Sequence, residues 1–158
     1  MTRPTSDVPT DVIRTETMTL REPPARKRRC IEFLVDVAAT AGYVADVEAA
    51  VDAVLERETQ APTGVGKGVA IPHAKTNAVD RPVVVFARSS DGVDFEALDD
   101  EPATLLFLLL VPADCADDHL QILSAVSRSL VHESTRRQLR SAESVEEIQT
   151  TLREGIGG

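Results

Sequence analysis

The residues best suited to chemistry lie in one short stretch, in which glycines at spacing two lead into an apolar run that ends at Pro72 and His73. Proline has no backbone N–H to donate to a β-ladder, and it pushes the preceding residue, Ile71, towards extended geometry. We therefore expect a strand to end here and to hold His73 at the edge of a sheet. A neutral imidazole held in this way suits nucleophilic or proton-transfer chemistry, although the residues by themselves leave open an ordinary, partly buried histidine.

The glycines Gly64, Gly66 and Gly68 would lie on one face of an extended chain, because side chains alternate between the two faces of a strand. A face without side chains lets another backbone, a ligand or a partner protein approach closely. We therefore expect Gly66 and Gly68, with Ile71 and Lys75 nearer the histidine, to contribute to a surface that binds a partner. Lys75 fits a solvated loop lysine equally well.

This stretch resembles the phosphorylation site of enzyme IIA of the fructose–mannitol class, a phosphocarrier of the bacterial-type sugar phosphotransferase system (PTS). The run Gly-Val-Gly-Lys-Gly-Val-Ala-Ile-Pro-His-Ala-Lys, preceded by Arg57 and Glu58, carries the resemblance. It extends over about residues 18–154 and includes three further segments in the same order, at residues 91–99, 104–112 and 119–123. The resemblance implies an α/β fold with a mixed, largely parallel β-sheet covered by helices on both sides.

The resemblance also implies roles for the polar residues around the motif. His73 would accept the phosphoryl group, which requires one ring nitrogen to be deprotonated and the other to donate its N–H to a fixed acceptor. His119 would lie beside it and orient or stabilise the phosphoryl group; the alternative is a surface or capping histidine. Arg57 could bind two phosphoryl oxygens with its guanidinium, or it could pair with the end of its helix or with Glu56 or Glu58.

Other polar residues give weaker signals. His119 should lie in the first turn of a helix, where the helix dipole disfavours the imidazolium form. Lys67 stands where some relatives carry an acidic residue, so an acidic role at this position is in doubt. His132 matches no motif and is expected on the surface. The spacing of His73, His119 and Cys115 does not support a zinc site, and we expect neither a metal nor a cofactor.

Composition narrows the class of protein. The chain of 158 residues has the size of one domain, and its net charge of −9 disfavours nucleic-acid binding. Arginine outnumbers lysine 14 to 3 and only 3% of residues are aromatic, a balance typical of proteins from a high-salt cytoplasm, with an ordinary acidic protein as the alternative. The longest apolar run, residues 105–111, is too short to span a membrane, and the N-terminus is polar, so we expect a cytoplasmic protein without membrane insertion.

The first half of the chain predicts a tail and two helices. Residues 1–16 show no hydrophobic period and should form a flexible tail ahead of a domain at residues 17–155. Residues 18–20 alternate weakly, as in a first strand. Apolar residues at helical spacing, including Cys30, then predict a helix that stops at Gly42 and a second helix capped by Asp46.

The second half predicts strands followed by helices. Continuous apolar runs at residues 83–87 and 104–111 indicate strands buried on both faces, with a turn at Asp91–Gly92. A helix capped by Asp117 or Asp118 should follow, and a last helix should begin with a capping box made by Ser144 and Glu147. The apolar stripe expected on the first of these helices consists of Leu120, Leu123, Val126 and Leu130.

The function that the resemblance implies is that of a fructose-type IIA phosphocarrier. Such a protein accepts a phosphoryl group on His73 from the phosphohistidine carrier HPr and passes it to the fructose-type IIB component, which feeds a membrane IIC permease. These partners are expected on separate chains, and their docking should be weak and fast. The alternative is a nitrogen-type regulatory IIA module, which would bind a regulator according to its phosphorylation state.

Overall fold

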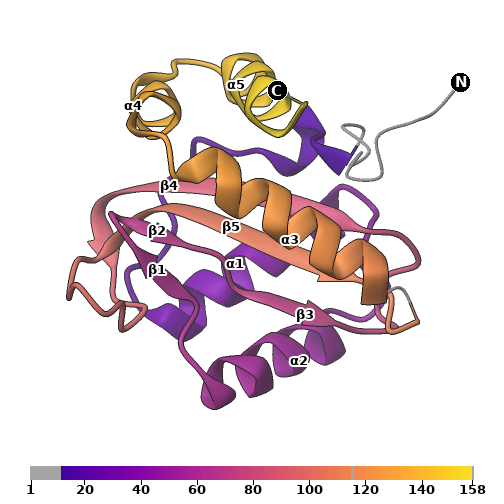
Figure 1. Cartoon of the computed structure of the whole chain (residues 1–158). Helices are drawn as coiled ribbons and strands as arrows, with labels where there is room; N and C mark the ends of the chain where they lie inside the picture. Colours follow the sequence, from indigo (N-terminus) through magenta and orange to yellow (C-terminus); the bar gives the residue numbers. More distant parts are fainter. Residues whose placement is uncertain (1–11, 115, 158) are drawn as a thin grey trace, which may run out of the picture.

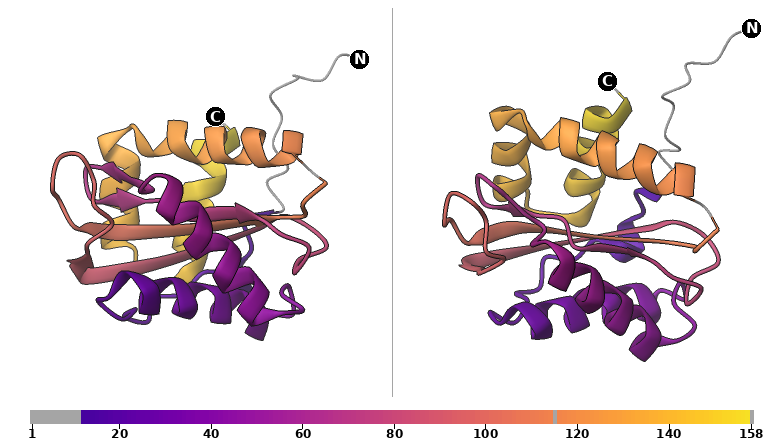
Figure 2. Two further views of the ribbon diagram at one scale, coloured as in Figure 1. Left: turned by 90° about the horizontal axis from the view of Figure 1, so that it is seen from below. Right: turned by 60° about the horizontal axis from the view of Figure 1, so that its bottom comes forward.

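The computed structural model describes residues 12–114 and 116–157, without the side chains of residues 116–119 and 157. A β-sheet lies between two layers of helices, with α1 and α2 on one face and α3, α4 and α5 on the other (Figures 1 and 2). Most of the predicted tail lies outside the described residues. Val12 and Ile13, which the sequence also placed in the tail, are buried in the core, so the packed domain begins earlier than predicted.

The first layer consists of α1 (Lys27–Thr40) and α2 (Val47–Gln60), both as predicted. Helix α1 ends just before Gly42, which has a φ of 92°. Helix α2 begins at Asp46, whose side chain accepts a hydrogen bond from the backbone N–H of Ala49 at 3.1 Å. Cys30 lies fully buried in this layer, and burial raises the pKa of its thiol to about 12, so it stays protonated and acts as a small core residue.

Strand β5 (Ala103–Val111) is central to the sheet and pairs with three other strands. β4 (Val83–Val93) runs antiparallel to β5, whereas β2 (Val69–Ala70) and β3 (His73–Lys75) run parallel to it. β1 (Gly64–Gly66) pairs antiparallel with β2. Residues 18–20 add a single parallel bridge from Met18 to Phe86 rather than the predicted strand. The mixed sheet is confirmed.

The apolar run of β5 serves both layers because side chains alternate along a strand. Leu106, Leu108 and Leu110 belong to the core under α1 and α2. Leu105, Phe107, Leu109 and Val111 belong to the core under α3, α4 and α5. A strand of this kind reads as a continuous apolar segment since neither face reaches water, as the sequence predicted.

β2 and β3 follow one another along β5 as two parts of an interrupted strand. β2 pairs with Leu105 and Leu106, and β3 pairs with residues 109–111 further along (Figure 1). Between them, the N–H of Ile71 donates to the carbonyl of Thr63 at 3.1 Å, which continues the pairing of Gly64 with Ala70 in the β1–β2 hairpin. The interruption therefore lies at Ile71 and Pro72, directly before the candidate nucleophile.

The second layer contains α3 (Ala116–Leu130), α4 (Glu133–Ser141) and α5 (Val145–Gly157). The predicted stripe on α3 is confirmed at Val126 and Leu130, which are buried, and Leu123 is partly buried against the same core. It was wrong at Leu120, which is 64% exposed, and Ile122 and Ala125 are buried in addition. Leu120 and Ile122 lie about 200° apart around a helix, so both cannot face the sheet. Asp117 and Asp118 lie inside the first turn, after the start of the helix, and therefore do not cap it.

Helix α4 was not predicted, and buried or half-buried arginines hold it in place. Arg136 donates to the carbonyls of Leu130 at 2.7 Å and Val131 at 2.9 Å, at the end of α3. Arg88, from β4, donates to three carbonyls at the end of α4, those of Leu139, Arg140 and Ala142. A cation at a helix C-terminus satisfies carbonyls that lack intrahelical partners.

Two further predictions concern local geometry. Asp91 and Gly92 do not form a turn but lie within β4, where the register shifts between Arg88 and Val93 and Gly92 adopts a φ of 90°. A bulge absorbs the extra residues without reversing the chain. At α5 the capping box is confirmed, because Glu147 N donates to Ser144 Oγ at 3.2 Å. None of the described helices is both long and apolar enough to cross a bilayer.

Candidate active site around His73

His73 is the first residue of β3 and lies opposite Leu109 in the sheet. Pro72 cannot donate a hydrogen bond, but its carbonyl accepts one from Leu109 N at 3.0 Å, which fixes the backbone directly before the histidine. The residue is 7% exposed. Its Nδ1 lies 2.7 Å from the carbonyl oxygen of Ile71. Because a carbonyl oxygen only accepts hydrogen bonds, Nδ1 carries the proton, and Nε2 of the neutral ring has the lone pair.

The surroundings of His73 keep its ring neutral. Burial lowers the pKa of the imidazole below its ordinary value, and the positive charge of Arg57 lowers it further. The hydrogen bond to Ile71 and the negative charge of Glu58 act in the opposite direction, but the net pKa is lowered. At neutral pH the side chain is therefore uncharged and able to act as a nucleophile through Nε2.

A pocket of about 400 Å³ opens at this side chain. His73, Ala74 and Lys75 of β3 line it from one side, and residues of α2 line it from the other: Ala53, Glu56, Arg57 and Gln60. Arg57 Nη1 donates to the carbonyl of Ala61 at 3.3 Å, just beyond the end of α2. That bond uses one of the five guanidinium N–H groups, so Arg57 bonds to the end of its helix and also lines the pocket, while its role towards a phosphoryl group stays a prediction.

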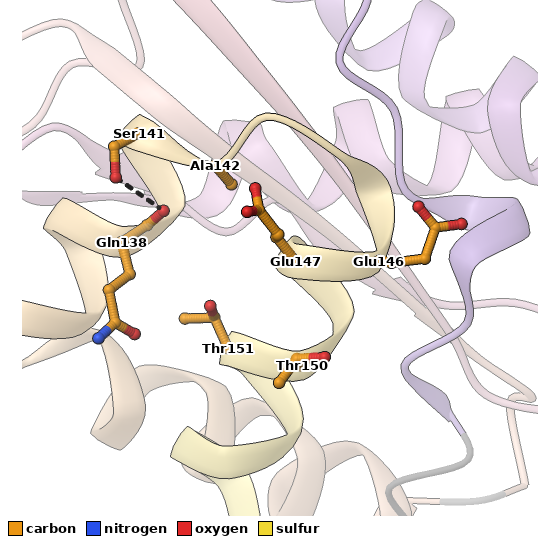
Figure 3. A pocket seen from close by; sticks show the side chains of 7 residues that line it. All are labelled: Gln138, Ser141, Ala142, Glu146, Glu147, Thr150 and Thr151. Carbon is orange, nitrogen blue, oxygen red and sulfur yellow. Dashed lines mark hydrogen bonds between the residues drawn. The ribbon is translucent and has the colours of Figure 1, made fainter.

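A second hollow of about 390 Å³ lies between α4 and α5 (Figure 3). Glu146, Glu147 and hydroxyl residues line it, and its lining contains no histidine, lysine or arginine. Two carboxylates without a cation repel a phosphoryl group. The chemistry expected from the sequence therefore belongs to the His73 pocket.

The sequence from residue 11 to residue 155 matches the family described as "Phosphoenolpyruvate-dependent sugar phosphotransferase system, EIIA 2". This chain belongs to the EIIA 2 family. It is thus a component of a phosphotransferase system, and the resemblance seen in the sequence is confirmed.

Comparisons with individual proteins show which members of the family this chain is similar to. It is 58% identical over 141 residues to the "PTS system fructose-specific EIIA component" of Haloferax volcanii, covering 89% of this chain and 92% of that protein. The nitrogen regulatory protein IIA-Ntr from Neisseria meningitidis matches its structure with a TM-score of 0.82 at 28% identity, covering 90% and 97% of the two chains. A complex of enzyme IIAMTL and phosphorylated enzyme IIBMTL from Escherichia coli matches with a TM-score of 0.75 at 28% identity, covering 88% and 95%. The Haloferax relative accords with the high-salt composition.

The glycines of this EIIA 2 chain do not form the flat face that their spacing predicted. Gly66, Lys67 and Gly68 have φ values of 89°, 58° and 77°, so they turn the chain between β1 and β2. Asp99 accepts from Lys67 N at 2.9 Å, and Arg140 Nη2 donates to Lys67 O at 2.9 Å. Gly68 lies beside the first residues of β5, whereas His73 pairs with Leu109 near the last residues of that strand. Neither Gly66 nor Gly68 lines the pocket at His73.

The structure also places the remaining predicted site residues. Lys75 lines the pocket, whereas Ile71 is 2% exposed and contributes its carbonyl to His73 rather than its side chain to a surface. His119 lies in the first turn of α3, but its side chain is outside the described part of the structure, so its role stays a prediction. β5 leads into α3 from the end where β3 pairs, which brings this turn to the His73 end of the sheet (Figure 1). His132 is exposed, as predicted.

Sequence reasoning missed two polar residues of the pocket, Glu56 and Gln60. Both share a face of α2 with Ala53 and Arg57, because residues three and four positions apart are neighbours on a helix. The helical spacing from Arg57 would have found them, since every residue of α2 that lines the pocket lies three or four positions from another one.

Proposed function

We propose that this protein is a fructose-type IIA phosphocarrier that accepts a phosphoryl group from HPr on His73 and passes it to the IIB component. The single observation that carries the proposal is the fixed, neutral imidazole, whose proton is on Nδ1 and whose lone pair is on Nε2. The name of the Haloferax volcanii relative supports fructose as the sugar, and the complex of the Escherichia coli proteins supports IIB as a partner.

The transfer step needs little beyond positioning and charge. The Nε2 lone pair of His73 attacks the phosphorus of the phosphohistidine donor, an Nε2–P bond forms, and the donor's N–P bond breaks with its electron pair returning to the donor nitrogen. His73 keeps its Nδ1 proton, so its ring becomes positive on phosphorylation. The Ile71 carbonyl, 2.7 Å from Nδ1, stabilises this charge.

The cations of the pocket would neutralise the phosphoryl oxygens. The guanidinium of Arg57 can donate hydrogen bonds to two of them in a fork geometry, and the ammonium of Lys75 adds a second positive charge. Release to IIB reverses the step: a cysteine thiolate of IIB attacks phosphorus, and the electron pair of the Nε2–P bond returns to the ring. In-line positioning and charge neutralisation supply most of the catalysis in phosphoryl transfer.

In this role the protein would bind its partners transiently in the cytoplasm. HPr and IIB would each dock for a single transfer, which favours a small interface with fast dissociation, and the IIC permease would take up the sugar in the membrane. The partner-binding roles predicted for Gly66, Gly68 and Lys75 belong to this proposal, whereas the buried side chain of Ile71 is out of reach of a partner. Lys75 has the most direct support because it lines the pocket.

The experiment combines the protein with enzyme I, HPr and phosphoenolpyruvate and follows its intact mass. The wild-type protein should gain one phosphoryl group and His73→Ala none, whereas the matched control His132→Ala, at an exposed histidine, should be labelled like the wild type. Phosphorylation that persists in His73→Ala would refute the site.

A second candidate is a nitrogen-type regulatory module, favoured by the TM-score of 0.82 to the Neisseria meningitidis protein. Adding a fructose-type IIB to the phosphorylated protein separates the two. Loss of the phosphoryl group to IIB supports the transport role. If the protein stays phosphorylated in the presence of IIB, the regulatory role is supported instead.

A further inference from the structure

Glu58 is a buried carboxylate directly behind the active site. It follows Arg57 on α2, but successive residues of a helix point about 100° apart, and Glu58 is not among the residues that line the described pocket. Its side chain is 5% exposed and lies 2.7 Å from Lys27 Nζ, at the start of α1. A buried charge destabilises a fold unless it is paired, and substitution by an apolar residue often stabilises such a site. Core packing alone therefore does not account for a carboxylate here.

The second partner of Glu58 is Thr63, which precedes the hairpin formed by β1 and β2. Thr63 N donates to Glu58 Oε2 at 3.2 Å, and Thr63 Oγ1 donates to Glu58 Oε1 in a short hydrogen bond. One carboxylate thus holds both the backbone and the side chain of Thr63. The whole arrangement is buried, so water does not compete for these bonds.

Thr63 in turn holds the residue that orients His73. The carbonyl of Thr63 accepts from Ile71 N at 3.1 Å, and the carbonyl of Ile71 accepts the Nδ1 proton of His73 at 2.7 Å. This bond extends the β1–β2 hairpin by one pair beyond Gly64 and Ala70, so it links Thr63 directly to the backbone between β2 and β3. Three consecutive links therefore connect the Glu58 carboxylate to the imidazole.

The hairpin leaves little freedom for Thr63 to shift. A Cβ atom at Gly64 would lie 3.0 Å from the carbonyl oxygen of Phe95, so this backbone packs closely on its neighbour. Lys27 Nζ lies 5.5 Å from the centre of the Phe95 ring and 3.6 Å from Glu96, so the ion-pair partner of Glu58 is anchored at the same place. The Glu58 carboxylate, from which the hydrogen bonds lead to His73, is therefore held in a fixed position.

We propose that Glu58 is a positioning residue: its carboxylate fixes Thr63, and through Thr63 it fixes the Ile71 carbonyl that sets the tautomer and direction of the His73 ring. The inference rests on the proposed function of His73 as the phosphoryl acceptor. Without Glu58, Thr63 loses its anchor, the Ile71 carbonyl is held from one side only, through the bond from Leu109 N to Pro72 O, and the neutral ring can also carry its proton on Nε2. That form has no lone pair on Nε2 and cannot take up the phosphoryl group there.

The test compares Glu58→Ala with the conservative variant Glu58→Gln, using Asp52→Ala at an exposed site on the same helix as the control. Nitrogen NMR of the imidazole should show the Nδ1–H form in the wild type and a mixture of both tautomers in Glu58→Ala. The rate of transfer at saturating phospho-HPr should fall roughly tenfold or more, with KM nearly unchanged. Glu58→Gln keeps an acceptor for Thr63 and should recover most of the rate.

Several outcomes overturn the proposal. A folded Glu58→Ala protein with a single tautomer and the wild-type rate excludes a positioning role, and so does an effect confined to KM. If Glu58→Ala does not fold, Thr63→Val decides: it removes only the hydroxyl bond, and an unchanged tautomer there is equally fatal. The NMR measurement needs no phosphoryl donor, so it is independent of the proposed function, whose own failure appears as phosphorylation of His73→Ala.

Discussion

Acidification is expected to protonate His73 only below the pH at which an ordinary histidine takes up its proton, about pH 6.5. Burial is the main cause of the lowered pKa, and the charge of Arg57 adds to it, while the Ile71 bond and Glu58 oppose both. Only the neutral ring has a lone pair on Nε2. Phosphoryl acceptance should therefore stay constant as the pH falls from about 8 past 6.5 and should decrease only at lower pH.

The same shift makes folding depend on pH. Between the ordinary pKa of the unfolded chain and the lower pKa of the folded protein, the unfolded chain binds a proton at residue 73 that the folded protein does not. The free energy of unfolding should therefore fall as the pH falls through this window, at up to about 1.4 kcal/mol per pH unit. Above the window, His73 contributes no slope. Arg57→Met removes a charge that lowers the pKa, so its window should be narrower and its acceptance should begin to fall at higher pH.

Urea unfolding at a series of pH values, for the wild type and His73→Gln, measures this term. The 26 acidic residues are common to both proteins, so the difference in slope reports residue 73. Equal slopes, or an imidazole NMR titration at or above the ordinary histidine pKa, would show that burial does not keep this ring neutral.

Three further perturbations test separate parts of the structure. Arg57→Met should slow transfer roughly 10- to 100-fold, the equivalent of a charge-assisted hydrogen bond of about 1.5–3 kcal/mol, and a wild-type rate in rapid-quench experiments would restrict Arg57 to its bond with Ala61. His119→Ala should still accept phosphate but pass it on poorly; normal onward transfer to IIB would return His119 to a structural role. Arg88→Met leaves three helix-end carbonyls without their donor and should lower the free energy of unfolding by about 2–3 kcal/mol, read from the urea midpoint, while leaving transfer unchanged.

Patterns that depend on local spacing were predictable from the sequence. Residues 105–111 of β5 include no polar residue on either face, which only a strand covered on both sides can accommodate. The helical stripes of α1 and α2 and the Asp46 cap of α2 follow from residues a few positions apart. The position of His73 at a strand boundary followed from Pro72 for the same reason. Its role followed only from the family resemblance.

Features that depend on contacts between distant residues were not predictable. The turn at Gly66–Gly68 is held by Asp99 and Arg140, and helix α4 is held by Arg88, all far away in the sequence. Leu120 was misplaced because an apolar residue contributes equally to a pattern whether it faces the core or the solvent. The link from Glu58 to His73 passes through two backbone carbonyls, for which no side-chain pattern exists.

The break between β2 and β3 has a consequence for the speed of a relay. Both halves of that strand are bonded to β5, so His73, the proposed phosphoryl acceptor, belongs to the middle layer of the fold rather than to a surface loop. Its backbone should exchange amide hydrogens as slowly as the central strand does. The imidazole is therefore already oriented when a partner protein binds, and binding does not have to supply the free energy for ordering it.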